Sequence, residues 1–239
     1  MIQRAALALY RLGAYLAFQA SFLALILAST GLGSVLSVDK HPRLPPLAAF
    51  AVDVGLVLLF GVQHSVMARP WFKRLVPERI ERSTFVIASS ACASAMALAW
   101  SPIEGDLWHL GGPAAVAVQG VALLGFGLSA VSSFAFDHFE LFGLRGARSG
   151  QFRVPAMYRI VRHPMMLGIL IGVWAAPHMT LGHLIFAAAL TAYILVGVRY
   201  EERDLVRTFG QEYQRYRAAV PCLLPWPRPT NALRERALE

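Results

Sequence analysis

Long apolar blocks separated by short polar stretches run along this chain. A block of about 20 apolar residues forms a helix that can cross the roughly 30 Å hydrocarbon core of a bilayer. The pattern therefore predicts an all-α, polytopic membrane helix bundle of about six spans. The last two blocks form a helical hairpin, because a proline between them breaks the helix. The predicted spans cover residues 10–36, 47–67, 83–100, 114–136, 165–176 and 179–198, with the break at Ala176-Pro177-His178.

These blocks predict one integral membrane domain over residues 1–226, followed by a flexible tail over residues 227–239. The domain divides into a four-span bundle (1–136) and a hairpin region (137–226) that ends in an amphipathic segment on the cytoplasmic side. The first apolar block resembles a signal peptide. It continues to about Leu36 without a clean small-residue cleavage site, so we interpret it as a retained first span.

Composition and charge support a membrane protein and indicate its orientation. Hydrophobic residues make up 56% of the chain and charged residues 15%, whereas soluble domains carry about 25% charged residues. With six spans, 20 of the 22 Lys and Arg residues lie on one side, which the positive-inside rule makes cytoplasmic. Five spans would place one terminus on the other side and fit less well. We therefore expect a bacterial-type inner membrane protein with both termini in the cytoplasm, and the net charge of +8 does not indicate nucleic acid binding.

Polar residues within or beside apolar spans are costly when unpaired, so they mark functional positions. Here they gather on the predicted cytoplasmic side, and we expect a site that opens there. The two cysteines have no spacing typical of a disulfide or a metal site, and no metal is expected. The polar groups are Gln63-His64-Ser65, Asp137-His138 with Glu140, Tyr158 to Pro164, and Tyr200-Glu201-Glu202.

The hairpin brings its two ends, Arg162-His163 and Glu201-Glu202, to the same membrane face. The second arm is longer, which places His163 about 15 Å deeper than Glu201 unless that arm tilts or leaves the membrane. Arg162 and His163 can hold a carboxylate or phosphate, and the glutamates can accept from an ammonium or from ribose hydroxyls. Gly168 permits close approach of a ligand, and aromatic rings can face a sulfonium. This set suits a cationic nucleoside that bears an amino acid.

The same region resembles a known superfamily. The run Arg162 to Gly168, the pair Glu201-Glu202, and Phe209-Gly210 followed by Tyr213, Tyr216 and Val220-Pro221 are similar to the carboxy-terminal signature of isoprenylcysteine carboxyl methyltransferases, which phospholipid methyltransferases share. The resemblance implies binding of S-adenosyl-L-methionine, with S-adenosyl-L-homocysteine as product. It implies cofactor contacts at Arg162, His163, Gly168, Glu201, Glu202 and Tyr213. Met166 departs from the pattern, because the superfamily commonly has Tyr there.

The first half resembles a narrower group. Residues 63–73, 81–83 and 137–144 are similar to the NnrU-like branch, and the chain as a whole is similar to the methanethiol S-methyltransferase family. The resemblance implies methylation of methanethiol, a small thiol, to dimethyl sulfide. In-line transfer to a thiol needs alignment and a base or a positive field. The candidates for that role are His64, His138 and His163, and Trp71, Phe139 and Phe142 are candidates to line the substrate pocket.

Three alternatives remain open from the sequence. A lipid-type methyltransferase would act on an isoprenylcysteine carboxylate or a phospholipid amine through a lateral opening to the bilayer. A haem or metal protein could use His64, His138 and His163 as ligands, although no helix carries two histidines at ligand spacing. A transporter or scaffold would bind no S-adenosylmethionine. The oligomeric state is not indicated by the sequence.

Overall fold

The computed structural model describes residues 2–32, 36–39, 44–145 and 152–225. Among these residues, five helices are long and apolar enough to cross a membrane, and a sixth apolar helix is shorter. The expected all-α membrane bundle is thereby confirmed. The predicted tail over residues 227–239 lies outside the described residues. The long helices are α1 (Ile2–Thr30), α2 (Pro46–Met67), α4 (Glu78–Ala99), α5 (Gly112–Ser133) and α8 (Leu181–Ala219), and the short one is α7 (Pro164–Trp174).

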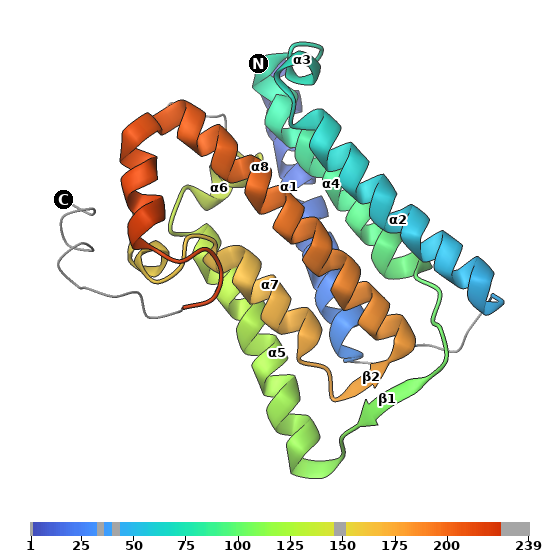
Figure 1. Cartoon of the computed structure of the whole chain (residues 1–239). Helices are drawn as coiled ribbons and strands as arrows, with labels where there is room; N and C mark the ends of the chain where they lie inside the picture. Colours follow the sequence, from blue (N-terminus) through green and yellow to red (C-terminus); the bar gives the residue numbers. More distant parts are fainter. Residues whose placement is uncertain (1, 33–35, 40–43, 146–151, 226–239) are drawn as a thin grey trace.

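Short elements connect the helices (Figure 1). Where the sequence predicted only a break near Pro177, a two-stranded antiparallel sheet pairs β1 with β2. Thr180 caps the start of α8 by accepting a hydrogen bond from the His183 amide. The short elements are α3 (Pro70–Lys73), β1 (Asp106–His109), α6 (His138–Leu141), the 3₁₀ helix η1 (Ala156–Arg159) and β2 (His178–Thr180).

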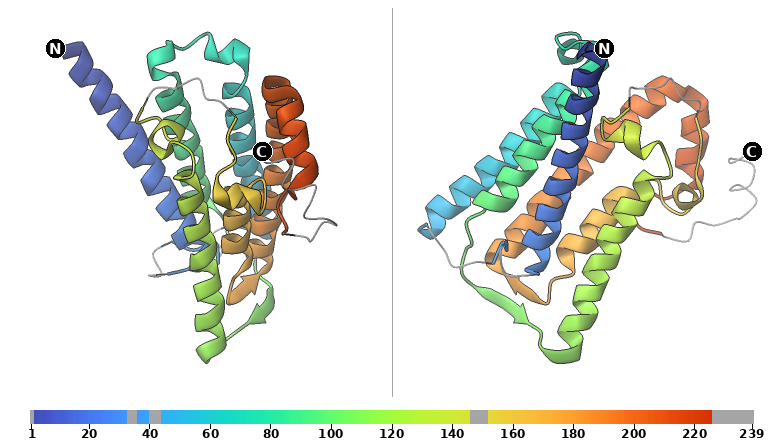
Figure 2. Two further views of the ribbon diagram at one scale, coloured as in Figure 1. Left: turned by 90° about the vertical axis from the view of Figure 1, so that its left-hand side faces the viewer. Right: turned by 180° about the vertical axis from the view of Figure 1, so that it is seen from behind.

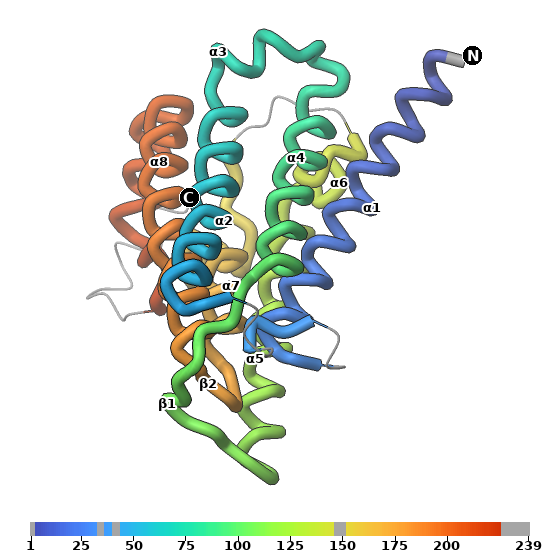
Figure 3. Tube along the Cα trace, turned by 90° about the vertical axis from the view of Figure 1, so that its right-hand side faces the viewer, coloured from blue at the N-terminus to red at the C-terminus, as the bar shows by residue number. Residues whose placement is uncertain are grey.

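The helices form two layers. Helices α8, α2, α4 and α1 lie side by side in a row (Figure 3), and successive helices of this row are in contact. Helices α5 and α7 form the second layer, and α7 contacts both α8 and α1. The turned views show α1 leaning away from the bundle toward its N-terminus (Figure 2). Phe126, Trp100 and Phe186 belong to the buried core between these layers.

Glycines bring α5 and α7 into close backbone contact. A Cβ atom on Gly168 would lie 2.5 Å from both the Gly125 carbonyl oxygen and the Ser129 amide nitrogen. A Cβ on Gly172 would lie 2.6 Å from the Phe126 ring. Close packing of small residues is how apolar helices associate where water provides no driving force. This interface fixes the start of α7, and with it the polar residues that precede the helix.

The last helix changes direction at Gly210, which has φ +57° and ψ −127°. Residues with a Cβ avoid this backbone conformation, so glycine is needed at the kink. The chain beyond the kink folds back toward the start of α7 (Figure 1). There Tyr213, Tyr216 and Val220 form a second buried cluster with Phe152 and neighbouring apolar residues. The kink therefore places the end of α8 over the polar residues at the start of α7.

Candidate active site

An ion-pair network centred on Glu202 joins α8 to the start of α7. Glu202 Oε1 lies 2.7 Å from Arg162 Nε and 2.6 Å from Arg162 Nη2. Glu202 Oε2 lies 3.2 Å from Arg217 Nε, beyond the kink. Arg162 and Glu202 are 7% and 6% exposed. Buried charges require such partners, and loss of one partner leaves the other uncompensated. Glu202 therefore holds three segments together.

Arg162 also fixes the chain that follows α8. Its Nη1 donates to the carbonyl oxygens of Arg217, at 3.0 Å, and Val220. The backbone amides of Arg162 and His163 donate to the carbonyls of Pro221 and Cys222 at 2.9 and 3.1 Å. Four of the five guanidinium N–H groups thus have protein acceptors. The sequence suggested that Arg162 holds a ligand anion; in the structure its anion is Glu202.

His163 lies between the two carboxylates that the hairpin was expected to supply. Its Nε2 is 3.2 Å from Glu202 Oε1, and its Nδ1 is 3.7 Å from Glu201 Oε2. The 15 Å offset expected from the unequal arms is therefore absent. Both ring nitrogens face a carboxylate, but only Nε2 is within hydrogen-bond distance, so the neutral imidazole carries its proton there and leaves a lone pair on Nδ1. The Glu201 side chain is 52% exposed, unlike the buried Glu202, so the two glutamates have different surroundings.

A cavity of about 300 Å³ lies beside this network. Its volume is at the small end of the range for small-molecule sites, about 300–1,000 Å³. Aromatic rings make up much of its wall, as suits a site for an organic cation. Tyr158 also lines it, and burial, followed by the Glu201 charge, raises the pKa of Tyr158 to about 12, so that its hydroxyl stays protonated. The lining residues are Phe136, Phe152, Arg153, Tyr158, Arg162, His163, Glu201, Leu205, Phe209, Tyr213 and Tyr216.

Tyr213 lines this cavity, and its buried hydroxyl has no hydrogen-bond partner among the described residues. Tyr213 is 2% exposed, and its oxygen has no hydrogen bond to any residue that the structure describes. A buried hydroxyl without a partner costs about 1–3 kcal/mol. Tyr216, by contrast, donates to the Tyr158 carbonyl oxygen at 2.7 Å. Because Tyr213 lines the cavity, a polar ligand bound there is a candidate partner for this hydroxyl.

Gly168 does not line the cavity. Its Cβ position points at the backbone of α5, so the space that the missing side chain leaves is filled by Gly125 and Ser129. From the sequence, we predicted that this glycine allows a ligand to approach the helix backbone closely. The structure instead supports helix packing, which holds the start of α7, and hence His163, in place.

His138 and two of the expected pocket residues lie together against α1, outside the cavity lining. His138 Nδ1 is 2.6 Å from Ser133 Oγ, and Nε2 is 3.1 Å from the Tyr15 hydroxyl. Its ring stacks on Phe134, and burial lowers its pKa. Phe142 stacks on Phe18 with ring centroids 3.5 Å apart, and Phe139 lies near Tyr15. These contacts attach α6 to α1.

His64 and Trp71 also lie outside the cavity lining. His64, on α2, has its Nδ1 3.4 Å from Ser89 Oγ, and its ring packs against Phe60 and Phe85. Trp71, on α3, is 57% exposed and does not enclose a small substrate. Of the three histidines proposed as bases, the structure brings only His163 to the cavity.

Sequence reasoning missed part of the cavity wall. Phe152 comes from the connection between α6 and η1, and no local periodicity marks it. Leu205 and Phe209 are four residues apart on α8, one turn beyond Glu201, so they share its helix face. That spacing could have identified them. Arg217 was also missed, because its role depends on the fold-back at Gly210.

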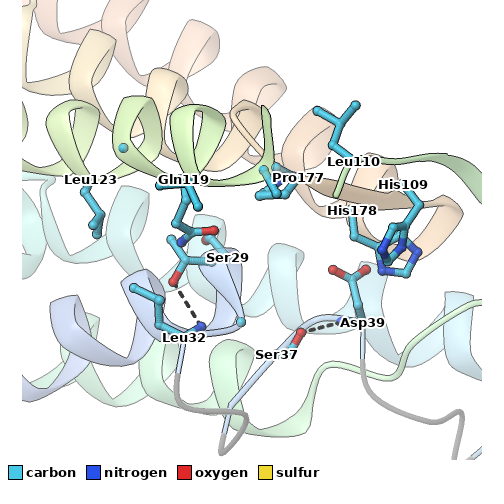
Figure 4. A pocket seen from close by; sticks show the side chains of 16 residues that line it. Ser29, Leu32, Ser37, Asp39, His109, Leu110, Gln119, Leu123, Pro177 and His178 are labelled. Atoms are coloured by element: carbon cyan, nitrogen blue, oxygen red, sulfur yellow. Dashed lines mark hydrogen bonds between the residues drawn. The ribbon is translucent and has the colours of Figure 1, made fainter. Parts of the chain in front are cut away.

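A larger and more open hollow of about 1190 Å³ lies at the other end of α7 (Figure 4). Asp39 in its wall bonds Thr180 and His183, and His109 and His178 lie side by side. It contains none of the residues of the superfamily signature. Size alone therefore does not identify the reaction site, and the charge network and the free hydroxyl favour the smaller cavity.

Comparison with known proteins identifies the family. The family model described as NnrU protein matches residues 54–224. Methanethiol S-methyltransferase 2 of Bradyrhizobium diazoefficiens is 44% identical over 94% of this chain and 92% of its own. The methanethiol S-methyltransferase of Pseudomonas deceptionensis is 44% identical over 79% and 78%, and that of Mycobacterium tuberculosis is 42% identical over 80% and 84%. No solved structure matches the chain.

The matched residues 54–224 include the whole ion-pair network, the cavity and the kink at Gly210. The B. diazoefficiens protein is aligned over almost the full length of both chains. The chain belongs to the NnrU family and to the family of the methanethiol S-methyltransferases.

Proposed function

We propose that this membrane protein transfers the methyl group of S-adenosyl-L-methionine to methanethiol and releases dimethyl sulfide and S-adenosyl-L-homocysteine. The observation that carries the proposal is the cavity in which His163, Glu201 and the unpartnered Tyr213 hydroxyl meet aromatic walls. A relative that is 44% identical over 94% of this chain and is named methanethiol S-methyltransferase 2 supports the same activity.

The residues around the cavity suit the cofactor. Bound S-adenosylmethionine supplies a methyl group on a sulfonium, which makes the methyl carbon electrophilic. The half-exposed Glu201 carboxylate can offset positive charge on the ligand, and Tyr213 can donate its free hydroxyl. The rings of Phe136 and Phe209 can face a cation. Arg162 and Glu202 contribute by fixing His163 and the chain beyond the kink.

His163 is the proposed base for the thiol. Glu202 holds the Nε2 proton at 3.2 Å, and Nδ1 then accepts the proton of the thiol as the sulfur attacks. Alkyl thiols are mostly protonated at neutral pH, so this step raises the concentration of the reactive thiolate. Positioning in a closed site contributes further, because alignment of the reacting atoms replaces a bimolecular encounter.

The small cavity favours a small acceptor. A volume of about 300 Å³ leaves little room for a large acceptor beside a nucleoside cofactor, which favours methanethiol over a prenyl or acyl chain. Phe152, Leu205 and Phe209 surround the cavity with apolar surface, which excludes water from the thiolate. The lipid-type alternative lacks a comparable supporting observation.

The proposed orientation places both termini and this cavity on the cytoplasmic side of an inner membrane, where S-adenosylmethionine is made. The distribution of 20 of 22 basic residues on that side supports it. Cysteine labelling with an impermeant maleimide, at single cysteines introduced near each end of the chain, tests this topology in intact cells.

The activity test uses purified protein in detergent with S-adenosylmethionine and methanethiol, and measures dimethyl sulfide in the headspace. We expect methylation of methanethiol, with turnover decreasing for longer alkyl thiols. His163→Asn should lower kcat by about 10²–10⁴-fold, the usual contribution of a general base. His64→Ala is the matched histidine variant. Loss of turnover in His64→Ala with full activity in His163→Asn would reject the base assignment, and no dimethyl sulfide from the wild type would reject the proposed reaction.

A further inference from the structure

Two histidines lie side by side on the two-stranded sheet, at the end of α7 opposite the candidate active site. His109 of β1 and His178 of β2 are directly paired in the strand register. Their ring centroids are 4.8 Å apart, with an interplanar angle of 52° (Figure 4). Both line the large hollow, so they are accessible from outside the bundle. Nothing in the proposed methyl transfer uses them.

A carboxylate fixes the tautomer of one of these rings. His178 Nε2 is 2.7 Å from Asp106 Oδ1, which makes Nε2 the protonated nitrogen of the neutral ring and leaves a lone pair on Nδ1. Histidines that bind metals commonly donate their other ring N–H to a carboxylate in this way, which orients the ring and increases its basicity. His109 forms no hydrogen bond within the described residues for which contacts are given, so its ring can turn toward His178.

The separation of the rings suits one metal ion. Two imidazole nitrogens on a tetrahedral ion are about 3.3 Å apart when each bond is about 2.0 Å long. Rings whose centroids are 4.8 Å apart can place nitrogens of facing edges at that distance by small side-chain rotations. We propose that His109 and His178 bind one divalent transition-metal ion such as Zn²⁺ or Cu²⁺, with Asp106 orienting His178.

Such an ion would connect two parts of the chain that are distant in sequence. β1 leads into α5, and β2 leads into α8, the helix that carries Glu201 and Glu202. Imidazole ligands suit Zn²⁺, Cu²⁺ and Ni²⁺, and Cu²⁺ binds most tightly among these. Two protein ligands leave further coordination positions to water. The site therefore joins the layers at the sheet, away from the cavity.

The test uses the full-length protein with an affinity tag that lacks histidine, in detergent and without added thiols. One equivalent of Cu²⁺ is added, and the paramagnetic resonance spectrum is recorded. We expect one bound ion per chain, with splitting from two imidazole nitrogens. Zn²⁺ titration by calorimetry should give at least 10-fold weaker binding for His109→Ala or His178→Ala, and loss of this binding for the double variant. Asp106→Asn should weaken binding about 10-fold without abolishing it.

Two controls make the outcome decisive. Among the described residues, His163, Glu202 and Cys222 form another group whose donor atoms could hold an ion. Cys222→Ala removes the sulfur of that group, and this variant should bind Cu²⁺ as the wild type does. The double histidine variant should retain methyl transfer in the absence of metal, which shows that it is folded. Metal binding that persists unchanged in the folded double variant, or a spectrum without nitrogen splitting, would overturn the proposal.

Discussion

Replacement of Gly168 by alanine distinguishes a packing glycine from a glycine that contacts the cofactor. The added Cβ would lie 2.5 Å from the Gly125 carbonyl oxygen and from the Ser129 amide nitrogen. Ordinary contacts of a Cβ begin at 3.4 Å, so α5 and α7 would have to separate locally by roughly 0.9 Å. The atoms in the way belong to the backbone of a helix, and they cannot move aside as the end of a flexible side chain could.

The magnitude follows from the cost of overpacking, which is about 1–3 kcal/mol for an extra methylene-sized group. We place Gly168→Ala at the upper end of this range, because two backbone atoms are approached together. Gly127→Ala, on α5, is the matched control, since its Cβ would meet no atom of the described residues within 4 Å. Alanine replaces glycine there in an open helical position, and we expect stabilisation of about 0.5–1 kcal/mol.

The assay is thermal unfolding in detergent, followed by intrinsic fluorescence, together with calorimetric binding of S-adenosylhomocysteine. We expect Gly168→Ala to lower the melting temperature, while Gly127→Ala leaves it unchanged or raises it. Any loss of cofactor affinity in Gly168→Ala should be small and indirect, because it arises only from displacement of the start of α7. An unchanged melting temperature with a large loss of affinity would refute packing as the role of Gly168 and restore it as a ligand contact.

Three further predictions concern the network and the kink. Tyr213→Phe should weaken S-adenosylhomocysteine binding in calorimetry while leaving the melting temperature equal or higher, because the hydroxyl has no hydrogen-bond partner to lose in the part of the chain that the structure describes. A fall in stability with unchanged affinity would contradict this. Arg162→Gln should cost about 3–5 kcal/mol in denaturant unfolding, because it removes the buried arginine that makes the two shortest contacts of Glu202. Arg217→Gln, at a half-exposed arginine, should cost about 0–1 kcal/mol, and equal losses would refute the distinction. Gly210→Ala should lower the melting temperature, because it adds backbone strain of about 1–3 kcal/mol, although its Cβ would meet no atom of the described residues within 4 Å. A neutral effect would show that the kink tolerates a side chain.

The sequence located the apolar helices because their signal is local, although the first was predicted at 10–36 and is found at Ile2–Thr30. Apolar blocks of bilayer length correspond to helices such as α2, predicted at 47–67 and found at Pro46–Met67. The meeting of His163 with Glu201 and Glu202 was also predictable, since both ends of a hairpin return to one face. The 15 Å depth offset, expected only if the second arm neither tilts nor leaves the membrane, is absent, because residue counts give arm lengths but not the course of the arms.

Other features depend on contacts between distant segments, which a single sequence does not reveal. His64 and His138 carry the same chemistry as His163, but their ring contacts attach them to α4 and α1. The sequence alone is consistent with Gly168 as a ligand contact or as a packing residue, and the position of α5 against it distinguishes the two. The fold-back at Gly210 is visible only as a glycine within a helical pattern, and it determines where Tyr213 points.

A solved structure with S-adenosylhomocysteine bound tests the account most directly. We expect the ligand in the cavity between the start of α7 and the kinked end of α8, with a polar atom in hydrogen-bond contact with the Tyr213 hydroxyl and the Glu201 carboxylate close by. Glu202 should remain paired with Arg162. Ligand density in the hollow lined by His109 and His178, or a bound state in which Tyr213 stays unpartnered, would contradict it.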